Sequence, residues 1–294
     1  MCHPDGAVSD KDFITIDTPH LTIEGRSRAG HETWFRIREL NAAFDIGRCP
    51  DQLIATPHIF VTHAHLDHAV GIPFYGGQRQ LHGMTGGHVY IPADAADGMR
   101  EILAIYERLT GASFAEIEVV GLSVGDVTPL GRTHEVRVHR ATHRVAANAY
   151  EVIDCRHHLK TEFAGRDERE ITELRRAGNE VTEEVKRSML FYTGDTDRGI
   201  LEVNEAMYKS EVLMIECSFI KTGHEERAAK YRHIHFDDIA AFADRFENET
   251  IVLTHFSRRY SRSEIHDEIR RRCPAVLRER IRLALPEPYQ RLRA

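Results

Sequence analysis

The chain has 294 residues, of which 41% are hydrophobic and 29% charged, and it carries a formal net charge of −7 at pH 7. This acidic balance argues against a protein coated in basic surface, so any binding of nucleic acid needs a local patch. No segment approaches the roughly 20 apolar residues of a membrane span.

The cysteines and the N-terminal residues give a prediction of the cellular compartment. The five cysteines are dispersed and include no Cys-x-x-Cys pair, so we expect free thiols. Residues 1–12 are short of apolar side chains and contain acidic ones, which predicts that no signal peptide is present. Together these features predict a cytoplasmic protein that does not associate with membranes.

Apolar segments recur along the whole chain, without a linker rich in proline, serine or glycine and without a fixed-period repeat. We therefore expect residues 1–294 to form one domain. Residues 159–187 differ because they are dense in charges of both signs, and their clearest pattern is a helix around residues 168–177. We interpret them as a solvated, charged helical insertion.

The N-terminal part predicts a meandering β layer and then alternating strands and helices. Strands are expected at 13–17, 20–24, 33–37 and 41–44, with a loop at 25–30 and a turn at 51–55. A buried strand at 59–61, a helix starting at Ala69, a strand at 86–92 and a helix at 93–109 follow.

The rest of the chain continues this alternation. Strands are expected at 117–120, 136–138, 149–153, 189–192, 212–215 and 251–253. Amphipathic helices at 236–246 and 263–272 should cover a sheet. The pattern indicates an α/β fold.

A cluster of potential metal ligands follows the strand at 59–61. The sequence there is Thr62-His63-Ala64-His65-Leu66-Asp67-His68. Imidazole nitrogens and a carboxylate suit zinc, and one tight turn lets them converge without distant parts of the chain. His63 and His65 point the same way while Asp67 and His68 lie on the next turn, so one loop can serve two adjacent ions. Single histidines mean little in a chain with 19 of them, but this run is far rarer than chance clustering.

Other strands also end in residues that suit metal or acid–base chemistry. Asp195 follows the strand at 189–192, Glu216 follows 212–215, and His255 follows 251–253. His143 follows the strand at 136–138. Because function gathers where strand ends open onto loops in layered α/β proteins, these residues predict a single site.

These motifs resemble the metallo-β-lactamase superfamily, and more closely its ribonuclease Z branch. Residues 62–68 match the superfamily's His-x-His-x-Asp-His signature, and Phe-Tyr-Thr-Gly-Asp-Thr at 191–196 resembles its Gly-Asp-Thr strand end. Glu-Cys-Ser-Phe at 216–219 resembles the branch's Glu-Ala-Thr-Phe element, and residues 253–260 are similar to its Thr-His-Phe-Ser-x-Arg-Tyr ending. The resemblance runs from about residue 20 to 260. It implies a four-layer αββα sandwich with a dimetal site at one edge of the sheets.

The resemblance also implies a set of ligands for two zinc ions, with manganese or iron as alternatives. One ion would be bound by His63, His65 and His143, the other by Asp67, His68 and His255, with Asp195 bridging them. Such a pair can hold a hydroxide and neutralise phosphoryl oxygens during in-line attack. Asp67 would thus serve as a catalytic residue as well as a ligand.

Two further roles follow from the same resemblance. The proton for the leaving alkoxide would come from His233, oriented by Glu216, with His235 as the alternative donor. The substrate phosphate would be contacted by Ser257, Arg259 and Tyr260.

The implied activity is that of a zinc-dependent phosphodiesterase acting on precursor tRNA 3′ ends or on a smaller diester, as a homodimer. A hydrolase of the same fold acting on an ester, thioester or lactone and a non-catalytic metal-binding protein stay open as alternatives. The choice of substrate is open because the branch's N-terminal Gly-Thr…Pro-x-x-x-Arg-Asn element and the Gly-Pro pair of its tRNA-binding arm are missing here.

The C-terminal segment is rich in arginine. It contains Arg270, Arg271, Arg272, Arg278, Arg280, Arg282, Arg291 and Arg293. Acidic residues alternate with them, so we expect a solvated helix face with paired charges and not an RNA-binding surface.

Overall fold

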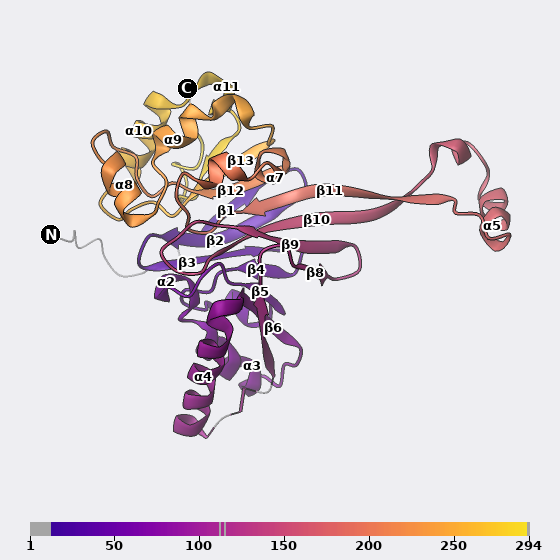
Figure 1. Cartoon of the computed structure of the whole chain (residues 1–294), viewed down its shortest axis with the longest axis horizontal. Helices are drawn as coiled ribbons and strands as arrows, with labels where there is room; N and C mark the ends of the chain where they lie inside the picture. The colour runs from indigo at the N-terminus through magenta and orange to yellow at the C-terminus, as the bar shows by residue number, and fades with distance from the viewer. Residues whose placement is uncertain (1–12, 112, 115, 293–294) are drawn as a thin grey trace.

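The computed structural model describes residues 13–292 except 112 and 115, so the predictions for residues 1–12, Cys2 and Arg293 lie outside it. Two seven-stranded sheets face each other, and helices cover the outer face of each (Figure 1). This arrangement confirms the predicted four-layer αββα sandwich.

Each sheet combines an antiparallel half with a parallel half. The first sheet contains, in spatial order, β1 (Ile14–Asp17), β2 (Thr22–Arg28), β3 (Glu32–Ile37), β4 (Ala42–Phe44), β5 (His58–Phe60), β6 (Gly87–Pro92) and β7 (Ile117–Leu122). The second contains β14 (Ile281–Leu283), β13 (Thr250–Thr254), β12 (Val212–Glu216), β11 (Thr182–Tyr192), β10 (Asn148–Leu159), β9 (His134–Arg140) and β8 (Val127–Leu130). Strands β4 to β7 and β11 to β14 are the parallel sets, so their carboxyl ends share an edge.

The helices fall into two groups. The first half of the chain has α1 (Asp51–Ile54), α2 (Leu66–Ala69), α3 (Ile72–Leu81) and α4 (Ala93–Thr110). The second half has α6 (Ile200–Val203), α7 (Ala206–Lys209), α8 (Glu225–Tyr231), α9 (Phe236–Ala241), α10 (Arg262–Arg272) and α11 (Ala275–Arg278), with 3-10 turns η2 (Thr161–Phe163) and η3 (Ala243–Arg245). Among the described residues, no helix combines the length and the apolar character needed to cross a bilayer.

Aromatic side chains fill the space between the sheets. Phe44 stacks on Phe60, and the rings of Tyr150 and Tyr192 pack against Phe44. These side chains are almost completely buried, and each such ring contributes several kcal/mol at about 25 cal/mol per Å² of apolar area. The inter-sheet core therefore fixes the sheets rigidly beneath the edge where the predicted ligands lie.

The loop predicted at residues 25–30 is wrong over its first four residues, which belong to β2. Gly25 pairs with Phe35 in β3, and a Cβ atom at Gly25 would lie 2.5 Å from the ring of Phe35. Glycine is needed there because the neighbouring strand approaches closely. Read locally, the same glycine indicated a turn.

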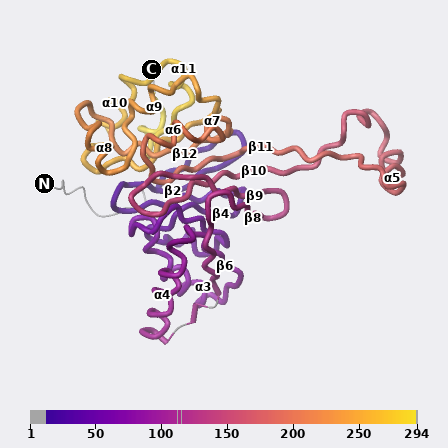
Figure 2. Tube along the Cα trace, viewed as in Figure 1, coloured from indigo at the N-terminus to yellow at the C-terminus, as the bar shows by residue number. Residues whose placement is uncertain are grey.

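A long two-stranded arm projects from the body of the protein, with α5 (Glu168–Arg176) near its tip (Figures 1 and 2). The helix predicted in this segment is present, but β10 and β11 extend well beyond the predicted strands at 149–153 and 189–192. The outer halves of β10 and β11 are exposed, so their sequences lack the alternation of apolar and polar residues that predicts a strand. Residues 159–187 include seven basic and eight acidic side chains, so the arm is nearly neutral.

Within the described part of the chain the cysteines are free, as predicted, and the predicted pairing of C-terminal arginines with acidic side chains is present for Arg271 and Arg272. Cys49, Cys155, Cys217 and Cys273 are free thiols. Arg271 pairs with Glu268, and Arg272 pairs with Glu268 and Asp237. The guanidinium groups of Arg278, Arg280 and Arg282 donate to backbone carbonyls. These arginines therefore stabilise the C-terminal helices.

Candidate metal centre

The segment that runs from the end of β5 through α2 carries four potential ligands at the edge where the two sheets meet. They are His63, His65, Asp67 and His68. The N–H of Asn148 at the start of β10 donates to the carbonyl oxygen of Thr62 (2.9 Å), which ties this segment to the second sheet. Because the segment is anchored to both sheets, its side chains are held in fixed directions.

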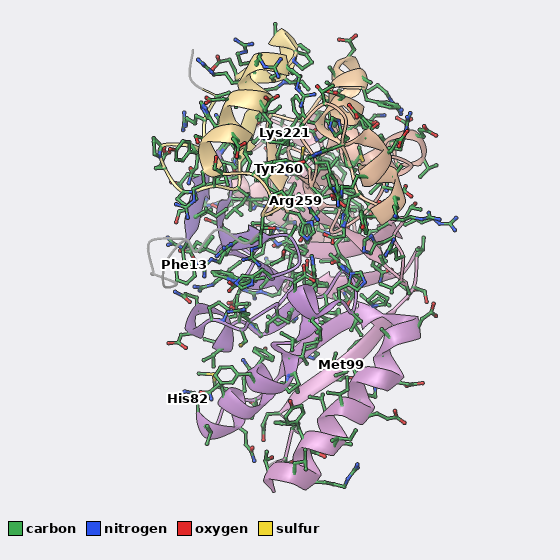
Figure 3. The ribbon with its side chains drawn as sticks, turned by 90° about the vertical axis from the view of Figure 1, so that its left-hand side faces the viewer. Phe13, His82, Met99, Lys221, Arg259 and Tyr260 are labelled. Carbon is green, nitrogen blue, oxygen red and sulfur yellow. The ribbon has the colours of Figure 1, made fainter. Side chains whose placement is uncertain are left out.

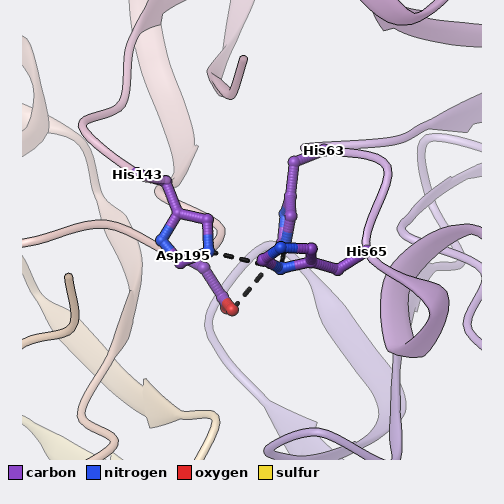
Figure 4. Close-up of side chains that lie close together, drawn as sticks. All are labelled: His63, His65, His143 and Asp195. Atoms are coloured by element: carbon purple, nitrogen blue, oxygen red, sulfur yellow. Dashed lines mark hydrogen bonds and ion pairs between the residues drawn. The ribbon is translucent and has the colours of Figure 1, made fainter. Parts of the chain in front are cut away.

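Three further potential ligands come from the second sheet. His143 follows β9, Asp195 follows β11, and His255 follows β13. Nitrogen or oxygen atoms of His63, His65, His143 and Asp195 lie within 4.8 Å of one another (Figure 4), and the same distance holds for Asp67, His68 and His255. All seven residues that the sequence nominated as ligands therefore lie in one cluster.

Asp195 lies between the two groups of side chains. One of its carboxylate oxygens, Oδ2, is 3.8 Å from His63 Nε2 and 3.3 Å from His255 Nε2. The other, Oδ1, is 3.4 Å from His68 Nε2. A single carboxylate thus reaches both groups, as a bridging ligand must.

The protonation states of most of these residues suit a divalent cation. Burial lowers the pKa values of His63, His65 and His143, so their imidazoles are neutral. Burial would raise the pKa of Asp195, but His255 and His68 hold it well below its ordinary value. Burial likewise opposes ionisation of Asp67, yet its hydrogen bond to His255 lowers the pKa to about 2. Neutral imidazoles and ionised carboxylates are what metal binding requires.

Asp45 is a buried residue at this centre that the sequence did not single out. Its Oδ2 is 2.8 Å from His68 Nδ1 and accepts a hydrogen bond from the Tyr192 hydroxyl (2.7 Å). Its Oδ1 accepts from the N–H (2.7 Å) and the hydroxyl (2.9 Å) of Thr62. Burial opposes the charged form of His68, but Asp195 and Asp45 raise the pKa of this imidazole well above its usual value. Asp45 therefore orients His68 and directs its Nε2 toward Asp195.

One feature of the sequence does indicate that Asp45 lies near the metal-ligand cluster, namely its position at the end of a strand. Asp45 follows β4 directly, and Asp195 likewise comes shortly after a parallel strand, three residues beyond the end of β11. Its backbone has φ of 60°, in the left-handed region that aspartate tolerates better than most residues. An aspartate at a parallel strand end was therefore informative at both places.

The half-buried His233 and the buried Glu216 form a second pair beside the cluster. His233 Nδ1 lies 2.8 Å from Glu216 Oε1, and the His233 ring centroid is 5.3 Å from that of His143 and 5.4 Å from that of His255. Burial opposes the charged imidazolium, but the Glu216 carboxylate raises the pKa of His233 to about 9. The imidazole is thus protonated near neutral pH and faces both groups of potential ligands.

Ser218 connects this pair to the metal-ligand cluster. Its hydroxyl donates to Glu216 Oε2 (2.6 Å) and lies 2.9 Å from His255 Nδ1. If the hydroxyl donates to the carboxylate, it accepts from the Nδ1–H of His255, which leaves His255 Nε2 free to coordinate. One carboxylate therefore orients both His233 and His255, a link that the Glu-Cys-Ser-Phe motif did not reveal.

His235, the alternative donor, has a structural position. Only 1% of its surface is exposed, its Nδ1 accepts from the backbone N–H of Asp237, and its Nε2 is 3.0 Å from the carbonyl oxygen of Lys221. Both ring nitrogens are used, and the side chain caps the first turn of α9. The structure therefore brings His233 to the cluster and leaves His235 in a capping position.

The three predicted substrate contacts line a cavity of about 1300 Å³ that also contains His65, His143 and His233. Arg259 Nη1 donates to the Ser257 hydroxyl (3.1 Å), so these two side chains act together. Tyr260 is buried, with its hydroxyl 2.6 Å from His224 Nδ1 and the Lys221 ammonium 5.7 Å from its ring centroid (Figure 3). Arg259 and Ser257 thus present polar groups to the cavity, whereas the Tyr260 hydroxyl already has a partner in His224.

Comparisons with known proteins point the same way as the motifs. A family model described as a beta-lactamase superfamily domain matches residues 33–256. The tRNase Z TRZ1 of Arabidopsis thaliana is 33% identical over 250 residues, which cover 84% of this chain and 89% of that protein. The chloroplastic tRNase Z TRZ2 of the same plant is 30% identical over 257 residues, covering 86% of this chain and 72% of that protein.

Solved structures share the fold. The metallo-beta-lactamase fold protein YhfI from Bacillus subtilis superposes with a TM-score of 0.58 at 13% identity, over 88% of this chain and 94% of that one. On the family match and the similarity to the two plant proteins, the chain belongs to the metallo-β-lactamase superfamily and, within it, to the ribonuclease Z branch.

Proposed function

We propose that this protein is a zinc-dependent phosphodiesterase of the ribonuclease Z type that processes the 3′ ends of precursor tRNA. The observation that carries the proposal is the placement of one protonated histidine, His233, against two adjacent groups of metal-competent side chains. Phosphodiester hydrolysis needs electrophilic assistance at the phosphate and a proton for the leaving oxygen, and this arrangement can supply both. The names of the two plant relatives support tRNA as the substrate.

Two zinc ions, with manganese or iron as alternatives, would be held by the seven side chains of the cluster. His63, His65 and His143 would hold one, Asp67, His68 and His255 the other, and Asp195 both. When bound, such ions supply Lewis acidity and an activated water at neutral pH. The mixture of nitrogen and oxygen donors is the set that zinc prefers in catalytic sites.

The remaining steps belong to side chains of this chain. Glu216 fixes the His233 ring through Nδ1, so Nε2–H is the group that can donate to the leaving 3′ oxygen. Arg259, held against Ser257, would bind a non-bridging phosphate oxygen and orient the diester. Burial of His63, His68, Asp195 and His255 lowers the local dielectric constant and strengthens the electrostatic interactions among them.

The experiment that tests this function is 3′-end processing of a precursor tRNA beside a panel of lactones and thioesters. We expect cleavage of the RNA, loss of cleavage after dialysis against a chelator, and recovery when zinc is added back. Cleavage that survives complete zinc removal would contradict the metal-dependent mechanism. Turnover of a lactone with intact precursor tRNA would favour the other hydrolase activities of this fold.

Replacing Ser218 tests the link between the acid pair and the ligands. Ser218→Ala should weaken zinc binding at the Asp67, His68 and His255 group by roughly 10- to 100-fold, because His255 loses the partner that orients its ring. Ser218→Thr keeps the hydroxyl and should retain most of the affinity. Competition against a fluorescent zinc chelator measures both variants, and equal affinities for Ala and Thr would show that Ser218 has no orienting role.

A homodimer is also proposed. Leu66 in α2, Val70 between the two helices and Phe74 in α3 are 74%, 51% and 52% exposed. Exposed apolar side chains so close together in sequence support burial against another copy of the chain. A monomeric sedimentation coefficient at micromolar protein would refute it. The cytoplasmic location stays a prediction.

A further inference from the structure

The C-terminal end of α8 is joined to the segment that carries His143. The Nδ1 of His143 lies 3.1 Å from the carbonyl oxygen of Arg232. In the next position along the chain, the Nη2 of Arg144 donates to the carbonyl oxygen of Lys230 (2.9 Å). These partners are 89 and 86 residues apart in the sequence. Two hydrogen bonds therefore hold the last residues of α8 beside one of the proposed metal ligands.

The turn that ends α8 fixes Tyr231 relative to His233. Arg232, which stands between them, has φ of 59°, in the left-handed region. The N–H of Arg232 donates to the carbonyl oxygen of Ala229 (3.2 Å), and the N–H of His233 donates to that of Ala228 (3.0 Å). These are the two hydrogen bonds of a Schellman cap. Because the backbone on both sides of the turn is tied to the helix, Tyr231 is held at a constant distance from the proposed proton donor.

Tyr231 is an aromatic residue outside the hydrophobic core. It is half-buried, and among the described residues it belongs to none of the clusters formed by buried apolar side chains. Its ring lies next to two cations instead. The guanidinium carbon of Arg144 is 5.1 Å from the ring centroid, and the ammonium nitrogen of Lys230 is 5.8 Å from it. An aromatic ring that stays partly exposed beside positive charges suits contact with a base of a polyanionic strand.

Tyr231 and Arg144 face the reaction centre. Both line the cavity of about 1300 Å³ that also contains His65, His143 and His233. In the proposed reaction His233 protonates the leaving 3′ oxygen, so the nucleoside that carries this oxygen must lie beside His233. Tyr231 stands two residues before His233 and lines the same cavity. The base of that nucleoside is therefore the part of the substrate best placed to contact Tyr231 and Arg144.

We propose that Tyr231 and Arg144 form a stacking platform for one nucleobase, the base of the nucleotide whose 3′ oxygen leaves when the diester is hydrolysed. The platform rests on the proposed function, since it names the part of that RNA substrate that these two side chains hold. Aromatic rings and guanidinium planes stack on any of the four bases. The platform thus adds affinity for RNA without reading its sequence.

Two RNA substrates that differ at one position test the platform. One carries a base on the nucleotide that precedes the scissile diester, and the other is abasic there. For the wild type, kcat/KM should be roughly 5- to 100-fold higher on the RNA with the base, the factor that stacking on an aromatic side chain contributes. Tyr231→Ala should abolish this preference, and Arg144→Ala should reduce it. Tyr231→Trp keeps a ring and should retain the preference.

The comparison of the two RNAs separates stacking from a purely structural role of Tyr231. Both substrates release a ribose 3′ oxygen, so a displaced His233 would slow the cleavage of both by the same factor. That result for Tyr231→Ala would overturn the platform. Tyr106→Ala is the matched control, because Tyr106 is a 45% exposed tyrosine of α4 that does not line the cavity. This variant should keep the wild-type preference.

A fluorescence measurement tests stacking without catalysis. 2-Aminopurine, which loses fluorescence when it stacks, is placed at the same position in a non-cleavable RNA. We expect saturating wild type and Tyr231→Trp to quench it and Tyr231→Ala to leave it bright; equal quenching by all three would overturn the platform. Wild-type protein that quenches 2-aminopurine but cleaves neither RNA would overturn the proposed function and leave the platform intact. Equal kcat/KM of the wild type on both RNAs would overturn the platform and leave the function intact.

Discussion

Replacing His233 with alanine is expected to lower turnover of precursor tRNA by about 10²- to 10⁴-fold while leaving the zinc content unchanged. The imidazole is placed by Glu216 and touches the ligand cluster from outside, so its loss removes a proton donor and no metal ligand in the proposed site. Single-turnover cleavage and metal analysis of the same preparation measure the two quantities. Parallel loss of turnover and of zinc would contradict the role of proton donor.

The leaving group gives this prediction a sharper form. A ribose 3′ alkoxide is a strong base and needs a proton as it departs, whereas p-nitrophenolate is a weak base and does not. His233→Ala should therefore affect RNA cleavage much more than hydrolysis of bis(p-nitrophenyl) phosphate. His235→Thr is the control, because threonine can replace the helix-capping role of His235 and should keep most of the turnover. A loss in the His235 variant as large as that in the His233 variant would make His235 the donor.

Much of the ligand cluster could be predicted from the sequence because its chemistry is local. His63, His65, Asp67 and His68 lie within six residues, so their convergence depends on one turn. Asp195 and His255 could be added because parallel strands bring their carboxyl ends to the same edge of a sheet. Residue type and strand position were sufficient for these residues.

What the sequence could not reveal are the contacts that orient the ligands. Ser218 bonds both Glu216 and His255, although 37 residues separate Ser218 from His255. The tip of the β2–β3 hairpin, which places Gly30 against Asp67, joins residues 37 positions apart. Such contacts depend on how the two sheets pack. Serine and glycine are common residues, so a serine or glycine in the sequence does not by itself predict these contacts.

The arm was only partly predictable for a different reason. Strands are recognised by alternation between a buried and a solvated face. Residues 155–159 and 182–187 are largely exposed on both faces. Their charged side chains pair within a strand (Arg156 with Asp154, Lys186 with Glu184), across the arm (Arg187 with Asp154) and with Glu135 of β9. Their β structure is stabilised by backbone hydrogen bonds in register and leaves no hydrophobic pattern.

Replacing Asp45 with alanine is expected to lower the free energy of unfolding by about 3–5 kcal/mol, as removal of one partner from a buried ionic network does. The change leaves His68 without its partner at Nδ1 and leaves two donors of Thr62 and the Tyr192 hydroxyl without an acceptor. The zinc affinity of the Asp67, His68 and His255 group should fall as well, by roughly 10- to 100-fold, because the His68 ring is no longer oriented. Chemical denaturation of the zinc-free protein and chelator competition measure the two effects separately.

Two milder substitutions distinguish the effect of the Asp45 charge from the effects of its backbone conformation and of its hydrogen bond to Tyr192. Asp45→Asn keeps the size and tolerates the left-handed backbone, so its loss of stability should stay near 1–3 kcal/mol, the approximate cost of one mismatched buried hydrogen bond. Tyr192→Phe removes one hydrogen bond of about 1 kcal/mol and leaves the contact between Asp45 and His68 in place, so its zinc affinity should match the wild type. The opposite outcome would be a free energy of unfolding for Asp45→Ala within about 1 kcal/mol of the wild-type value, together with unchanged zinc affinity. In that case the Asp45 carboxylate does not orient His68, and the sheets alone fix the ligand loop.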